Sequence, residues 1–251
     1  MTDEGSHSSL DNALRILNLF TMEQPELGVK EAAAQIGVAA STAHRLMSTF
    51  KEDGILVKDN TSNRYRLGIS ILALGSIIQS ETPLIKDSHQ ALKDLSLQTN
   101  ETVLLGVIQN KEIIYIDNIT SPNATAGYYS YQGQKFPIHS TGGGRLLLAY
   151  EKEEVIQDYL SCLSETGDHI IYEKKLAHLF KDIRKKGYAF TVNEHFAGVS
   201  SVACLVRTKK GTCNAAIEVI GPNHRFNQNS LPKIIKAVHE TASFLSRKNS
   251  T

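Results

Sequence analysis

The stretch Val29–Gly68, VKEAAAQIGVAASTAHRLMSTFKEDGILVKDNTSNRYRLG, decides the fold of the N-terminal part of this chain. Its first half carries the helical period twice, with the short turn Gly37-Val38-Ala39 between the two segments. Gly37 suits the left-handed conformation that often ends a helix. The apolar stripes are Val29, Ala32, Ala33 and Ile36 in the first segment, and Ala43, Leu46, Met47 and Phe50 in the second. We therefore predict two short helices joined by a tight turn.

The second predicted helix has a polar face opposite its apolar stripe. Its members are hydroxyl side chains, one imidazole and one guanidinium: Ser41, Thr42, His44, Arg45, Ser48 and Thr49. Such groups reach phosphate oxygens and base edges without filling a DNA groove. The face predicts a DNA-contacting surface, and the alternative is a helical hairpin with a solvated polar side.

A predicted β-hairpin follows the helices. Ile55–Lys58 and Arg64–Leu67 alternate with the strand period, and Asp59–Asn63 between them consists of turn formers. Alternation places Arg64 and Arg66 on one face, with Tyr65 and Leu67 on the other as a small core. The hairpin reads as a basic wing, which favours a winged helix-turn-helix over a plain helical hairpin.

Bulk composition limits the class of protein. The 251 residues allow one large domain or two modest ones, and 41% hydrophobic with 21% charged residues is ordinary for a globular protein with a core. No apolar run approaches the roughly 20 residues of a membrane span, and the polar, acidic start is unlike a signal peptide. Cys162, Cys204 and Cys213 lack the spacing of a zinc site or disulfide framework. We expect a cytoplasmic protein without membrane contact.

The net charge argues for more than one copy of the chain on DNA. The whole chain carries only +1, and residues 40–68 have only a small excess of basic side chains. One such module makes few phosphate contacts, and each contributes little at physiological salt. We therefore expect a dimer that reads paired half-sites.

Two further helices are predicted on either side of this module. The first covers Leu10–Thr21, with Ser8 or Ser9 as its N-cap. Its apolar stripe is Leu10, Ala13, Leu14, Leu17 and Phe20. The second covers Ile69–Ser80 and is too apolar for a solvated tether, so we expect it to pack against a partner copy. Pro83 marks the seam between domains.

The remainder alternates helices and strands. Helices are predicted at 84–99, 143–150, 153–160, 173–186 and 230–247. Strands are predicted at 101–109, 111–119, 126–131, 188–193, 199–208 and 213–220. Six strands, mostly in hairpins, with helices around them, predict an antiparallel α+β sandwich.

A glycine run marks a candidate ligand site. His139-Ser140-Thr141-Gly142-Gly143-Gly144-Arg145 leads directly into the apolar run Leu146–Ala149. Bare backbone N–H groups at a helix start suit a carboxylate or phosphate of a small ligand. The alternative is a helix entry that packs closely on the sheet.

Two acidic residues belong to the same region. Glu194 lies in a polar turn, and Glu218 interrupts the apolar strand Ala215–Ile220. A buried carboxylate is costly unless it is paired or hydrogen-bonded. Glu218 therefore either faces solvent, which simple alternation favours, or meets a specific partner.

Catalytic and metal-binding motifs are lacking in the sequence. There is no G-x-S-x-G, no H-E-x-x-H, and no cysteine with a base nearby in sequence. His195 beside Glu194 suggests a metal ligand only weakly, because isolated histidines are more often surface or hydrogen-bonded residues. We expect no catalytic residue, no metal and no cofactor.

The sequence resembles the IclR family of bacterial transcription regulators over almost its whole length. The matching motifs are Glu31-Ala32-Ala33, Gly37, Ser41–Leu46, Arg64–Gly68, Glu101-Thr102-Val103, Pro137–Thr141, Gly144, Arg184–Ala189, Glu194, Gly198-Val199, Val202-Ala203 and Gly221-Pro222. The resemblance implies a winged helix-turn-helix and a C-terminal GAF-like effector-binding domain, assembled as homodimers or homotetramers. It also implies an allosteric response to a small metabolite, often an organic acid, a sugar acid or an aromatic compound.

Departures from the family pattern affect both sites. Ala39 and Ala40 stand where relatives usually have proline and a basic residue, which leaves the helix start uncapped. Gly142-Gly143 replaces a Gly-Ala or Ala-Leu pair, Ser201 stands where Cys is frequent, and Glu218 takes a commonly small polar position. By motif position, the resemblance implies an effector pocket lined by Gly142, Gly143, Glu194, Ser201, Glu218 and Ile220. An acidic residue there would repel a carboxylate or favour hydroxyl and amino groups.

These observations combine into one hypothesis: an effector-responsive transcriptional regulator that represses a catabolic or transport operon. Residues 8–68 are expected to form the winged helix-turn-helix, 69–82 a linker helix and 83–251 the effector-binding domain. Arg45, Ser41 and Thr42 would enter the major groove of double-stranded operator DNA, with Arg64 and Arg66 on the flanking backbone or minor groove. His44 and Ser48 complete the expected set of DNA-binding residues. The alternatives are an activator of the same architecture and a small-molecule enzyme with a helical accessory domain.

Overall fold

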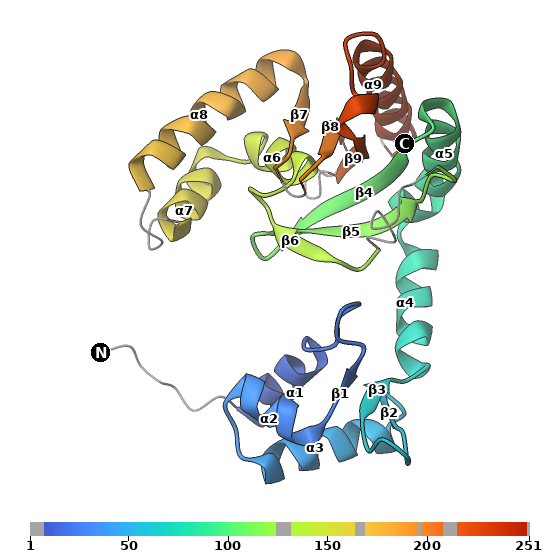
Figure 1. Cartoon of the computed structure of the whole chain (residues 1–251), viewed down its shortest axis with the longest axis vertical. Helices are drawn as coiled ribbons and strands as arrows, with labels where there is room; N and C mark the ends of the chain where they lie inside the picture. Colours follow the sequence, from blue (N-terminus) through green and yellow to red (C-terminus); the bar gives the residue numbers. More distant parts are fainter. Residues whose placement is uncertain (1–7, 124–131, 164–168, 195–196, 208–214, 250–251) are drawn as a thin grey trace. The chain divides into compact units, whose positions relative to one another are not determined.

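The computed structural model describes residues 8–123, 132–163, 169–194, 197–207 and 215–249, with only the backbone described for 169–175. The chain divides into two compact units, Met1–Glu81 and Thr82–Thr251, and each is described by itself (Figure 1).

The first unit is a winged helix-turn-helix. Its described elements are α1 (Ser9–Leu17), β1 (Glu26–Leu27), α2 (Val29–Ile36), α3 (Ala40–Glu52), β2 (Leu56–Lys58), β3 (Tyr65–Leu67) and α4 (Ser70–Glu81). The strands form a small antiparallel sheet in the order β1-β3-β2. The predicted helix pair and hairpin are confirmed, whereas the short strand β1 was not predicted.

Local sequence explains where these helices begin and end. Gly37 ends α2 with φ 74°, and its N–H donates to the carbonyl of Ala33. Ser8 begins α1 in a reciprocal capping box with Asp11. The core of the unit lies under α2 and α3 and includes Ile16, Leu27, Ala32, Ala33, Ile36, Ala43, Leu46, Met47, Leu56 and Tyr65.

The predicted stripe of α1 is wrong in part. Leu10 and Leu14 are 69% and 52% exposed, while Ile16, which was not in the stripe, is fully buried. The helix also ends at Leu17, short of Thr21, because Asn18 caps it by donating its side-chain N–H to the carbonyl of Leu14.

Helix α4 buries no residue within the single chain. Its large apolar side chains, and Ile69 just before it, are exposed: Ile69, Leu72, Leu74, Ile77 and Ile78. An exposed apolar surface of this kind is typical of an interaction site.

The second unit is built on a six-stranded antiparallel sheet in the order β6-β5-β4-β9-β8-β7. The strands are β4 (Thr102–Gln109), β5 (Glu112–Ile119), β6 (Lys135–Pro137), β7 (Tyr188–Val192), β8 (Val199–Val206) and β9 (Ala215–Pro222). Five predicted strands are confirmed, with small shifts at their ends. The strand predicted at 126–131 lies outside the described residues, and β6 was not predicted.

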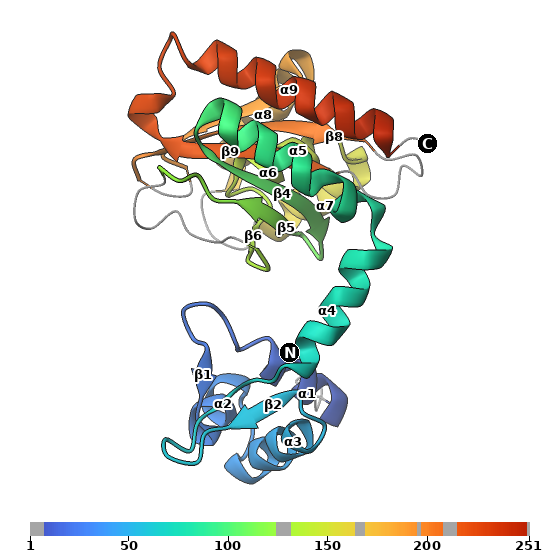
Figure 2. The same ribbon diagram turned by 90° about the vertical axis from the view of Figure 1, so that its right-hand side faces the viewer.

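Helices cover both faces of this sheet. They are α5 (Pro83–Thr99), α6 (Gly142–Ala149), α7 (Glu153–Leu163), α8 (His169–Lys186) and α9 (Leu231–Lys248), with a short 3-10 turn, η2, at Asn223–Arg225. Helices α5 and α9 contact each other and one face, and α6 contacts the opposite face with α8 packed against it (Figure 2). The predicted α+β architecture, with its helix-turn-helix and antiparallel α/β parts, is confirmed. Among the described residues, no helix is both long and apolar enough to cross a membrane.

Strand alternation divides the core of this unit into two layers. On β9, Ala216 and Ile220 belong to the layer that contains α6, while Ala215, Ile217 and Val219 belong to the layer under α5 and α9. Neighbouring side chains of one strand therefore face different helices.

Candidate DNA-binding surface and ligand cavity

Helix α3 exposes the polar face predicted from the sequence. Ser41, His44 and Arg45 are exposed, and Thr42 and Ser48 are half-buried at its margins. Ala39 provides no side-chain cap at the start of α3. The first turn thus offers backbone N–H groups beside hydroxyls and one guanidinium, a set of donors suited to phosphate and base edges.

The wing differs from its prediction at Arg64. The Arg64 guanidinium donates to both carboxylate oxygens of Glu31, at 3.0 and 2.7 Å, and to the carbonyl of Glu26 at 3.1 Å. The bond from Arg64 is also the main cause that lowers the pKa of Glu31. Arg64 therefore ties the start of β3 to α2, while Arg66 is exposed in the middle of β3.

The predicted small core of the hairpin is half correct. Tyr65 is buried, and the Lys58 ammonium lies 5.6 Å from the centre of its ring. Leu67 is 44% exposed, against the prediction. Within the three-residue strand β3, Tyr65 packs into the core of the unit and Leu67 does not.

The second unit contains a cavity that is partly open to solvent. It is lined by Leu104, Tyr115, Thr141, Gly142, Thr191, Glu194, Val199, Ser201, Glu218 and Ile220. Five of the six predicted effector residues therefore line this cavity, and the sixth, Gly143, lies next to Glu218. Sequence reasoning missed the other lining residues, although Thr141 carries the signal of an N-cap three residues before Gly144.

The start of α6 is packed tightly into this region. Thr141 accepts a hydrogen bond from the Gly144 N–H at 2.9 Å, which caps the helix. A Cβ on Gly144 would lie 2.1 Å from the carbonyl oxygen of Ile138. Gly144 is therefore required by close approach of two backbone segments.

Glu218 is buried inside the cavity wall and only 2% exposed. Tyr115 donates its hydroxyl to Glu218 Oε2 at 2.5 Å, and Ser201 and the backbone of Gly142 and Gly143 also hydrogen-bond to the carboxyl group. Burial raises the pKa of Glu218, and these four hydrogen bonds act to lower it. The expectation from alternation, that Glu218 faces solvent, is wrong because α6 covers this face of the central strand β9.

Glu194 lies at the edge of the cavity and pairs with Arg145. Arg145 Nη2 is 2.9 Å from Glu194 Oε2, and Arg145 Nε donates to the carbonyl of His139 at 2.5 Å. Arg145 is buried, whereas the Glu194 side chain is 38% exposed. Burial, followed by the charge of Arg145, lowers the pKa of His139. His195 lies outside the described residues, and the described part of the chain contains no cluster of three or more His, Cys, Asp or Glu residues that could hold a metal.

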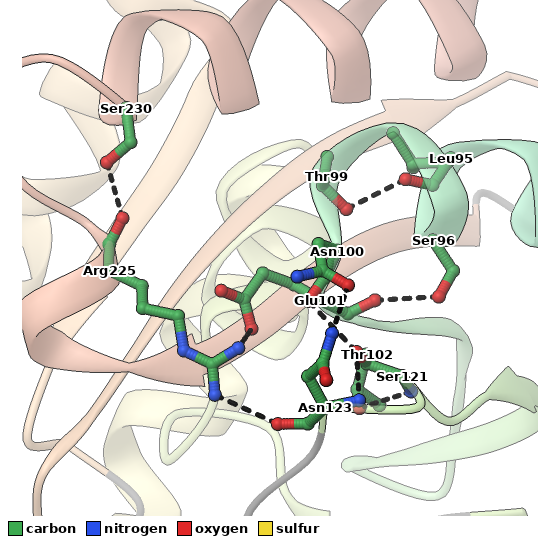
Figure 3. A network of polar contacts seen from close by, with 10 residues as sticks. All are labelled: Leu95, Ser96, Thr99, Asn100, Glu101, Thr102, Ser121, Asn123, Arg225 and Ser230. Atoms are coloured by element: carbon green, nitrogen blue, oxygen red, sulfur yellow. Dashed lines mark hydrogen bonds and ion pairs between the residues drawn. The ribbon is translucent and has the colours of Figure 1, made fainter.

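A second buried carboxyl group, Glu101, lies at the start of β4, away from the cavity-lining set. Arg225 Nη1 is 3.5 Å from Glu101 Oε2, and Arg225 Nη2 donates to the carbonyl of Asn123 at 3.0 Å (Figure 3). Burial raises the pKa of Glu101 to about 7, against the opposing charge of Arg225. The contact ties the beginning of β4 to η2.

A winged helix-turn-helix unit and a second unit with a cavity, in one chain, are typical of a transcriptional regulator. The model "Bacterial transcriptional regulator IclR C-terminal" matches residues 77–247, and "IclR helix-turn-helix domain" matches residues 9–60. The chain belongs to the IclR family of bacterial transcriptional regulators, which confirms the resemblance found in the sequence.

Individual relatives agree with this assignment. The "Transcriptional repressor IclR" of Escherichia coli is 27% identical over 248 residues, covering 94% of this chain and 89% of that protein. A regulator structure from Alicyclobacillus acidocaldarius has a TM-score of 0.85 at 24% identity and covers 98% of this chain and 100% of that chain. An IclR homolog from Microbacterium hydrocarbonoxydans, solved in complex with 4-hydroxybenzoate, has a TM-score of 0.80 at 19% identity, with coverage of 96% and 98%.

Proposed function

We propose that this protein is a cytoplasmic, effector-responsive repressor that binds operator DNA as a homodimer or homotetramer. Residues 8–68 bind DNA, 69–82 form the linker helix, and 83–251 hold a small-molecule effector. The observation that carries the proposal is the exposed polar face of α3 on a winged helix-turn-helix, in a chain whose second unit contains a cavity lined by both apolar and polar side chains.

The DNA-reading part of the proposal depends on α3. Arg45 is exposed beside Ser41 and His44, and its guanidinium is able to hydrogen-bond a guanine in a bidentate manner. Arg66 extends the surface onto the wing and contacts the flanking backbone. Arg64 contributes less than first expected, since its guanidinium already bonds to Glu31.

The assembly part of the proposal depends on the exposed apolar side chains of α4. Four large apolar side chains of α4 are exposed to water in the single chain: Leu72, Leu74, Ile77 and Ile78. A second copy packed on this helix would bury them. The low net charge of +1 favours the same conclusion, because paired modules double the phosphate contacts.

The proposed response to an effector requires that the ligand bind more tightly to one conformation of the protein than to another. A ligand in the cavity changes operator affinity only when it favours one arrangement of the two DNA-binding modules over another. Repression, rather than activation, is proposed because the E. coli relative is named as a repressor.

The decisive experiment is an operator-binding titration of Arg45→Ala against DNA from the protein's own upstream region and against random duplex. Loss of a bidentate base contact should cost about 1–3 kcal/mol of specific binding and leave random-duplex binding less affected. Lys233→Ala, which removes one exposed charge in the second unit, is the matched control. Wild-type protein that shows no preference for its own upstream region at moderate salt would refute the proposal.

A further inference from the structure

The cavity contains a carboxyl group supplied by the protein itself. Glu218 extends from β9 toward the first turn of α6, where the positive end of the helix dipole and the first backbone N–H groups lie. This is the position that the glycine run offers to the carboxylate of a ligand. In this chain a side chain of the protein occupies it.

The two glycines fix how closely the carboxylate approaches. A Cβ on Gly142 would lie 2.8 Å from Glu218 Oε1, and a Cβ on Gly143 would lie 2.8 Å from Glu218 Oε2. One oxygen therefore faces each glycine, and neither residue has room for a side chain while the carboxylate stays in place. The Tyr115 hydroxyl and Ser201 complete four hydrogen bonds to the group.

Four hydrogen bonds match the four lone-pair sites of a carboxylate. The donors that an acidic ligand would need at this end of the cavity are therefore already used. A second carboxyl group placed beside Glu218 would also share a site of low dielectric with it, which disfavours ionisation of both groups.

The remaining wall offers no compensating charge. Among the described lining residues the charged side chains are Glu194 and Glu218, and none is Lys, Arg or His. Arg145 lies behind Glu194 and donates to it and to the carbonyl of His139. Leu104, Val199 and Ile220 provide apolar surface for the body of a ligand.

We propose that the Glu218 carboxyl group blocks the N-terminus of α6 from within the protein, and that the cavity consequently accepts uncharged or cationic small molecules and excludes carboxylates. This inference rests on the proposed role of the cavity as the effector site. It sets this chain apart from the relative whose structure contains 4-hydroxybenzoate, an acid.

Glu218→Ala with acetate as the probe tests the assignment directly. Removal of the side chain frees the N-terminus of α6, so millimolar acetate should raise the melting temperature of Glu218→Ala. Acetamide, which has the same shape without charge, should bind at least tenfold more weakly to this variant, and wild type should respond to neither beyond a chloride control. Equal stabilisation of Glu218→Ala by acetate and acetamide, or of wild type by acetate, would overturn the proposal.

A wild-type ligand series keeps the test decisive should Glu218→Ala fail to fold. Benzoate is compared with benzyl alcohol and benzylamine, and acetate with glycerol, by calorimetric titration of the full-length protein. Wild type should bind each acid at least tenfold more weakly than its most favoured neutral or cationic counterpart. An acid that binds wild type as well as its counterparts overturns the inference.

Operator binding measured on the same samples separates this inference from the proposed function. An acid that binds wild type and alters operator affinity would refute the exclusion of carboxylates while supporting the regulator. Stabilisation of Glu218→Ala by acetate, in a protein without operator preference, would support the blocking role of the Glu218 carboxyl group and refute the regulator.

Discussion

Replacement of Gly144 by alanine tests the close contact that positions the wall of the cavity. The added Cβ would lie 2.1 Å from the Ile138 carbonyl oxygen, 2.8 Å from its carbon and 2.9 Å from Thr141 Oγ1. Carbon–oxygen contacts in proteins lie near 3.3 Å or beyond. The backbone at Ile138 must therefore separate from α6 by more than about 1 Å.

The expected loss of stability follows from three contributions. Overpacking at a site with little freedom to move costs about 1–3 kcal/mol. Displacement of Thr141 from its hydrogen bond with Gly144 costs about 1 kcal/mol, and alanine regains about 1 kcal/mol over glycine inside a helix. We expect a net loss of about 1–3 kcal/mol, equivalent to about 2–12 °C in melting temperature for a domain of this size.

Differential scanning calorimetry of the full-length protein measures this loss in the transition of the second unit. Lys233→Ala is the control, because Lys233 is exposed on helix α9 of the same unit. That variant should be as stable as wild type to within about 0.5 kcal/mol. A Gly144→Ala protein that unfolds at the wild-type temperature would show that the two segments do not approach as described.

Three further predictions concern single interactions. Thr141→Ala should lower the unfolding free energy by about 1 kcal/mol through loss of the α6 cap, measured by urea unfolding, whereas Thr141→Ser should retain most of it; equal stability of the two variants would contradict this. Glu101 holds its proton more tightly in the folded state, because its pKa is about 7 there against an ordinary value of 4.5. Its contribution to the unfolding free energy therefore falls as the pH rises from about 4.5 to about 7. Glu101→Gln should remove this contribution, and an unchanged dependence of stability on pH would count against burial of the carboxyl group. Ile77→Lys should shift sedimentation toward smaller species, while Gln79→Lys on the same helix should not, and identical behaviour of the pair would remove α4 from the interface.

The sequence predicts the first unit well because its signals are local. The helical period of 29–50, Gly37 and the turn formers at 59–63 all act within a few residues of one another. The bond between Arg64 and Glu31 joins residues 33 apart in sequence, and only the docking of β3 against α2 reveals it. The exposure of Leu67 was also not predictable from local sequence. Strand alternation predicts which side chains share a face, but not how much of that face the helices cover.

The second unit shows where local patterns fail. Strand β6 has three residues, Lys135–Pro137, and exists because β5 pairs with it, so its own sequence carries little strand signal. Alternation along β9 identifies two faces but not what covers them. The burial of Glu218 follows from the sheet order, which places β9 between β4 and β8, and from the contact of α6 with that face.

Strand β9 thus contributes side chains to both core layers of the second unit. Positions 216, 218 and 220 look toward the cavity side, while 215, 217 and 219 support α5 and α9. A lineage can therefore exchange the first set, and with it the molecules that are recognised, while the second set keeps the domain folded. Specificity in such a protein evolves on every other residue.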